Sequence, residues 1–150
     1  MDMVLDEDYV HRLLDYTTAV AVRMADLYLS VGMDVIAAVD PLVSQISPEH
    51  FRSFLKEPYS RLFTHIRQAG VKREVYSSFF VCGNATNQIE PMCETAPDCI
   101  SIDENVDMAT AKAVTDRYNI TLQGNIPLTT VMLFGSQQDN MKYVVDLHDA

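Results

Sequence analysis

The stretch Val75-Tyr-Ser-Ser-Phe-Phe-Val81, followed directly by Cys82-Gly83-Asn84, determines the fold that we predict. Its aromatic and β-branched residues form a short run of the length and composition typical of a buried strand. Glycine and asparagine then favour a turn. The sequence therefore predicts a strand that delivers a thiol and an amide to the loop after it.

Three further segments share this pattern of a short apolar run that ends in polar or turn-forming residues. They lie at residues 34–40, 99–102 and 120–123. We expect the first to be a strand that is buried on both faces. Segments with apolar residues at helical spacing alternate with the strands, at about residues 9–30, 47–66, 89–96, 106–114 and 137–148. Pro58 should kink or divide the second of these helices.

This alternation predicts an α/β protein with about four parallel strands joined by right-handed crossovers. The pattern alone permits either a doubly wound sheet or part of a barrel. At 150 residues, the chain is expected to form a single domain over residues 1–150.

Each predicted strand ends in a polar cluster, and in parallel α/β proteins the loops at these ends form the functional site. The clusters are Asp40-Pro41, Cys82-Gly83-Asn84, Asp103-Glu104 and Gly124-Asn125. We therefore predict that Asp40, Asn84, Asp103 and Asn125 bind a substrate. Asp and Asn at these positions also cap helices and form turns, which is the alternative interpretation.

Cys82 is a candidate metal ligand, although a small buried side chain is the alternative. A zinc site takes about four ligands of the Cys, His or carboxylate type. The residue two positions before Cys82 is Phe80, so no His-x-Cys pair occurs there. Cys93 and Cys99 lie within a predicted helix and a predicted strand, where packing is the expected role. All four histidines fall on predicted helices rather than at strand ends.

Composition excludes several classes of protein. The formal charge of −10 disfavours binding to nucleic acid. No run approaches the roughly 18 apolar residues of a membrane span. Three cysteines argue against a disulfide framework, which favours a cytoplasmic location.

The chain resembles the uroporphyrinogen decarboxylase superfamily in an ordered set of segments. These are residues 32–40, residues 46–51 continuing to Pro58-Tyr59, Val81-Cys-Gly-Asn84, residues 98–103 with Val106-Asp107, and Gly124-Asn-Ile-Pro127 with Leu133-Phe-Gly135. The resemblance implies part of a (β/α)8 barrel. A full barrel needs about 250 residues, so we expect a fragment comprising the later half. Two free sheet edges would then favour a homodimer.

The resemblance implies two activities. One branch of the superfamily transfers methyl groups from corrinoid proteins to thiols such as coenzyme M, using zinc, and Cys-Gly-Asn resembles this branch. Cys82 then falls on the cysteine ligand and Phe80 on the position of a histidine ligand. The other branch decarboxylates uroporphyrinogen without a cofactor. A third interpretation is a non-catalytic barrel remnant that binds a ligand. In each case we expect the isolated chain to be inactive, with a small-molecule substrate or a corrinoid protein as its partner.

Overall fold

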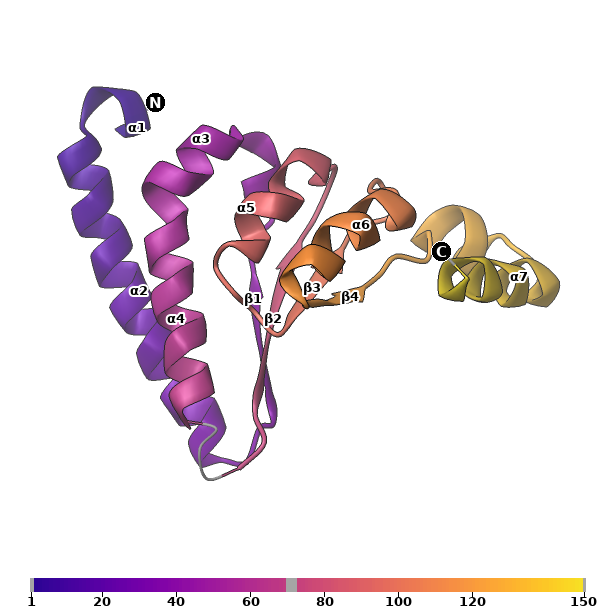
Figure 1. Ribbon diagram of the computed structural model, residues 1–150, viewed down its shortest axis with the longest axis horizontal. Coiled ribbons are helices and arrows are strands. Elements are labelled where there is room, and N and C mark those ends of the chain that lie inside the picture. Colours follow the sequence, from indigo (N-terminus) through magenta and orange to yellow (C-terminus); the bar gives the residue numbers. More distant parts are fainter. Residues whose placement is uncertain (1, 70–72, 150) are drawn as a thin grey trace.

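Four strands form one parallel sheet in the order β1-β2-β3-β4 (Figure 1). The computed structural model describes residues 2–69 and 73–149. The strands are β1 (Val35–Val39), β2 (Tyr76–Val81), β3 (Cys99–Ile102) and β4 (Thr121–Gln123). Each is an apolar run at which we predicted a strand, and the predicted parallel alternation is confirmed.

Helices connect the strands and flank them at both ends of the chain. The α-helices are α1 (Asp2–Leu5), α2 (Glu7–Ser30), α3 (Pro48–His50), α4 (Lys56–Ala69), α5 (Ile89–Cys93), α6 (Met108–Tyr118) and α7 (Gln137–His148). Shorter 3-10 or π turns are η1 (Val43–Gln45), η2 (Phe51–Leu55), η4 (Thr86–Gln88) and η5 (Leu128–Leu133). In Figure 1, α2 and α7 lie at opposite ends of the molecule.

The core lies between the sheet and its helices. Phe79 and Ile100 are fully buried on this helix-facing side, where Phe79 contacts the rings of Phe51 and Phe63. Residues at alternate positions point to the opposite face of the sheet. We call this opposite side the inner face and define it by Val39, Phe80, Ser101 and Gln123, which follow one another across the sheet in register.

The expectation that the first strand is buried on both faces is wrong. Val35 and Val39 are 57% and 60% exposed, whereas Ile36 between them is 8% exposed. Helix α2 and helix α4 bury one side of the strand, and the inner face at β1 stays open in the part of the chain that the structure describes. A run of apolar residues alone could not distinguish these two environments.

Pro58 does not divide its helix. Helical structure continues from Pro48 to Ala69, with the π turn η2 directly before α4. In this turn the amide of Lys56 donates to the carbonyl of Phe51, five residues earlier. A π turn shifts the hydrogen-bond register, and such shifts are a known way for a helix to accommodate an irregular residue.

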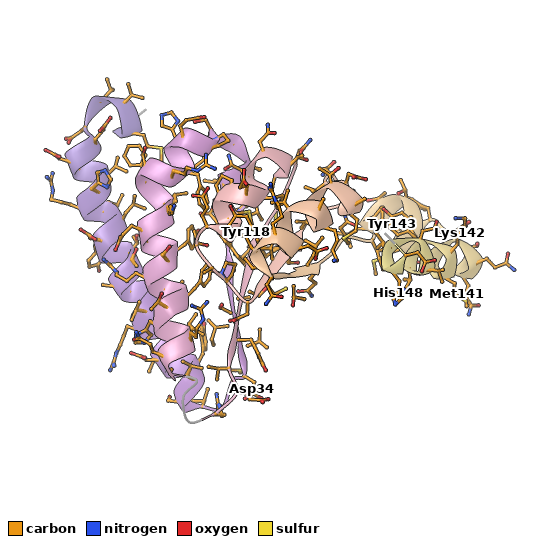
Figure 2. The ribbon with its side chains drawn as sticks, viewed as in Figure 1. Asp34, Tyr118, Met141, Lys142, Tyr143 and His148 are labelled. Carbon is orange, nitrogen blue, oxygen red and sulfur yellow. The ribbon has the colours of Figure 1, made fainter. Side chains whose placement is uncertain are left out.

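The predicted helix near the C-terminus is confirmed as α7. Ser136 and Asp139 form a capping box at its start, in which each side chain accepts a hydrogen bond from the other residue's backbone amide. Its apolar side chains are nonetheless exposed, with Met141 at 64% and Val145 at 56%. Figure 2 shows Met141, Lys142 and His148 at the end of the molecule remote from α2.

Candidate functional site at the carboxyl ends of the strands

The four strand ends lie along one edge of the sheet, which we call the rim. Parallel pairing places Val39 beside Phe80 and Val81 beside Ile102. The backbone amide of Asp40 also donates to the carbonyl of Phe80, at 3.0 Å, so the ladder extends past the end of β1. The loops after the strands therefore leave the sheet on the same side, as the sequence predicted.

Asp40 is at the rim, but its carboxylate is turned away from the inner face. Asp40 comes four residues after the buried Ile36, so in an extended chain both side chains point to the side that faces the helices. Oδ2 accepts a 2.7 Å hydrogen bond from the Tyr59 hydroxyl, and Oδ1 accepts from the amide of Leu42 at 3.0 Å. Both carboxylate oxygens thus bond to protein groups that fix the end of β1.

Tyr59, on α4, is a rim residue that sequence reasoning did not identify. Its ring lies 4.3 Å from that of Phe79, measured between centroids, at the edge of the aromatic core. Burial and the nearby charge of Asp40 both raise the pKa of Tyr59 above its usual range. Nineteen residues separate the two partners, and no local sequence pattern indicates such a pairing.

The turn after β2 carries the Cys82 thiol. Cys82 is a half-buried free cysteine that directly follows Val81, the last residue of β2. Gly83 follows with φ = 78°, a left-handed conformation that favours glycine. A Cβ atom at Gly83 would lie 3.0 Å from Ser44 Oγ, so the loop after β1 also packs closely against this turn.

Asp103, at the end of β3, contacts this same turn. The backbone amide of Gly83 is the main cause of a lowered pKa at the Asp103 carboxyl, and hydrogen bonds from Asn105 lower it further. Asp103 Oδ1 accepts from the amide of Asn105 at 3.0 Å. Asp103 thus carries a negative charge at neutral pH and connects the loops after β2 and β3.

Asn125 continues the connection to β4. Its Nδ2 donates to the carbonyl of Val106 at 2.6 Å and to that of Asp103 at 3.2 Å. Its Oδ1 is buried and has no partner among the described residues. Asn84, in contrast, is exposed and accepts from the amide and hydroxyl of Thr86 through Oδ1. The structure therefore brings Asp103 and Asn125 together, places Asn84 next to the Gly83 contact, and turns Asp40 toward α4.

The residues around Cys82 do not match the donor set of a zinc site. Phe80 offers no donor atom, and no group of three or more His, Cys, Asp or Glu residues in residues 2–69 and 73–149 could hold a metal ion. His11 stacks on Phe54 at 5.0 Å between ring centroids, and His65 contacts Asp26 at 2.7 Å. These histidines lie on helices, as predicted. No described helix combines the length and apolarity that crossing a membrane requires.

Known proteins resemble this chain in sequence and in structure. The sequence model of the uroporphyrinogen decarboxylase (URO-D) family matches residues 1–147. The methylcobamide:CoM methyltransferase MtbA of Methanosarcina mazei is 30% identical over 135 residues, which cover 89% of this chain and 38% of that protein. The uroporphyrinogen decarboxylase of Nostoc punctiforme is 29% identical over 133 residues, which cover 89% of this chain and 36% of that protein.

A methyltransferase from Methanosarcina mazei has a solved structure that matches with a TM-score of 0.82 and 24% sequence identity, over 95% of this chain and 40% of that chain. The predicted fold, an arc of a (β/α)8 barrel, is thereby confirmed. The chain spans less than two fifths of the length of the curated relatives described above. Its sequence and its fold together show that the chain belongs to the uroporphyrinogen decarboxylase family.

Proposed function

We propose that this chain forms the acceptor-binding part of a corrinoid-dependent methyltransferase-like enzyme, whose overall reaction transfers a methyl group to a thiol. The observation that carries the proposal is the Cys82-Gly83-Asn84 turn, which presents a half-buried cysteine at the rim, next to the loop that carries Asp103. Similarity to the methylcobamide:CoM methyltransferase MtbA, at 30% identity, supports the same branch.

The residues of this chain would bind and orient the acceptor. Ser101 and Gln123 lie side by side on the inner face, and both can donate hydrogen bonds to the polar end of a small thiol. The negative charge of Asp103 would favour an orientation in which donor groups of the substrate face the loop after β3. A corrinoid protein that supplies the methyl group would approach the same rim. Because the chain spans 38% of MtbA, we expect turnover to require more of the barrel than this segment.

Uroporphyrinogen decarboxylation is a second candidate, and Phe80 favours it. The position beside Cys82 lacks a metal donor, and the decarboxylase branch needs no metal. Uroporphyrinogen decarboxylases are also among the relatives, at 29% identity in Nostoc punctiforme. In this alternative the acids and hydrogen-bond donors of the rim would stabilise a protonated pyrrole intermediate.

Binding can be tested on the full chain without requiring turnover. We would record amide NMR spectra of the 150-residue protein while adding either coenzyme M or uroporphyrin, a stable oxidised form of the decarboxylase substrate. The proposal predicts shifts at the amides of Gly83, Asn84 and Asn105 with coenzyme M. The amide of Lys142 on the remote helix α7 serves as the internal control.

The two ligands separate the candidate functions. Shifts at the rim with uroporphyrin alone would support the decarboxylase alternative and reject the proposal. An absence of rim shifts with both ligands would reject both activities and favour a barrel remnant that binds some other molecule.

A further inference from the structure

Phe80 occupies the inner-face position that adjoins Cys82. Phe80 is the last inner-face residue of β2, and Cys82 comes two residues later, directly after the strand ends at Val81. Phe80 pairs in register with Val39 on β1, whose side chain is 60% exposed, and with Ser101 on β3. The rim therefore has a continuous apolar wall of Val39 and Phe80 directly beside the only cysteine that follows a described strand.

We infer that residue 80 sets the ligand chemistry at Cys82: with phenylalanine there, the rim is metal-free and offers an apolar wall to an organic ligand. The inference depends on the proposed function only for the location of the site. It predicts that the apolar part of a substrate, rather than a metal-bound thiolate, lies against Phe80.

The turn that carries Cys82 keeps its shape through protein contacts. The Gly83 amide faces the Asp103 carboxylate, and Ser44 packs against Gly83 from the loop after β1. Asn84 Oδ1 accepts two hydrogen bonds from Thr86, one from the amide at 3.2 Å and one from the hydroxyl at 2.7 Å. Contacts to three segments thus surround Gly83 and Asn84, the two residues that follow Cys82.

A histidine at position 80 would change this chemistry. Its ring would extend from the inner face of β2, two residues before the Cys82 thiol. Asp103 directly follows Ile102, the last residue of β3, which pairs with Val81, and so supplies a carboxylate just past the end of the neighbouring strand. One imidazole, one thiolate and one carboxylate are three ligands of the types that zinc accepts, with an open fourth position.

Cobalt(II) is a spectroscopic probe for this question, because a cobalt–thiolate bond has a charge-transfer absorption in the near ultraviolet. We would titrate the full chain and its Phe80→His, Phe80→Leu, Cys82→Ser and Phe80→His/Cys82→Ser variants with cobalt(II) at neutral pH. Circular dichroism would establish that each variant is folded. Cys93 and Cys99 remain in all five proteins, so any signal from them cancels in the comparisons.

We expect the wild-type and Cys82→Ser proteins to give the same spectrum. Phe80→His should gain a charge-transfer band that the double variant loses, whereas Phe80→Leu should gain none. A Cys82-dependent band in the wild-type protein would overturn the inference, and so would a folded Phe80→His protein without such a band. Metal titration and the coenzyme M experiment are independent, so a failure of one is distinguishable from a failure of the other.

Discussion

The Tyr59 hydroxyl donates a 2.7 Å hydrogen bond to the Asp40 carboxylate and thereby joins α4 to the end of β1. This contact holds the Asp40 side chain, which we predicted to bind a substrate, away from the inner face and toward the helices. Asp40 therefore has a clear structural role at the rim, whatever ligand the neighbouring loops bind.

Replacing Tyr59 with phenylalanine should lower the free energy of unfolding. The change removes the donor to a charged carboxylate in a partly buried site, a contact worth about 1.5–3 kcal/mol. Urea denaturation at neutral pH would measure the loss. Tyr118→Phe is the matched control, because its hydroxyl makes only a 3.4 Å contact to Glu90 at the surface. Equal effects of the two substitutions would contradict the role assigned to Tyr59.

The raised pKa of Tyr59 predicts a dependence of stability on alkaline pH. The unfolded chain loses this phenolic proton near pH 10, whereas the folded protein retains it to higher pH. The unfolded state therefore binds fewer protons above about pH 10, so the stabilisation is complete below that pH and declines as the pH rises. Urea midpoints at pH 9 and 11 should differ less for Tyr59→Phe than for the wild-type protein. If the urea midpoints at pH 9 and pH 11 differ as much for Tyr59→Phe as for the wild-type protein, the pH dependence comes from other groups.

Asp98 should be essential for stability although it lies far from the rim. Its Oδ2 accepts 2.7 Å hydrogen bonds from both the amide and the hydroxyl of Ser77, a fully buried residue of β2. Asp98→Ala would leave two buried donors unpaired, and each such group costs about 1–3 kcal/mol. Thermal or urea unfolding would measure this.

Asp116→Ala provides the comparison for Asp98→Ala. Asp116 pairs with Lys112 on the exposed surface of α6, and such pairs contribute about 0.3–0.5 kcal/mol. We expect the Asp98 variant to lose several times more stability than the Asp116 variant. Similar losses would show that the contact between Asp98 and Ser77 contributes little.

Self-association is the fourth prediction. Helix α2 exposes an apolar stripe that includes Tyr16 at 69%, Met24 at 46% and Leu27 at 56%, and β1 and β4 each have one edge unpaired among the described strands. Such surfaces favour association.

Light scattering after size-exclusion chromatography should show a dimer at micromolar concentration and a shift toward monomer for Met24→Lys. Ala113→Lys on α6 adds the same charge at an exposed position outside the stripe and should not shift the equilibrium. A monomeric wild-type protein would contradict the prediction.

The sequence by itself determined the order and the direction of the elements. The apolar runs at 75–81, 99–102 and 120–123 contain β2, β3 and β4, and the helical spacing at 137–148 predicted α7. Parallel strands with turn residues at their carboxyl ends must place those ends along one edge, so the position of the rim also followed from local pattern. These features depend on residues that are close together in the sequence, so the sequence of one chain is enough to predict them.

Only the tertiary structure decided which way each rim side chain points and what it contacts. Asp40 and Asp103 look equivalent in the sequence, yet one bonds to Tyr59 on α4 and the other faces the Gly83 amide of the neighbouring loop. Likewise, Val35 and Ile36 are similar residues with opposite exposure. The physical reason is that burial and hydrogen bonding at these positions depend on partners many residues away, which come together only when the sheet and its helices pack.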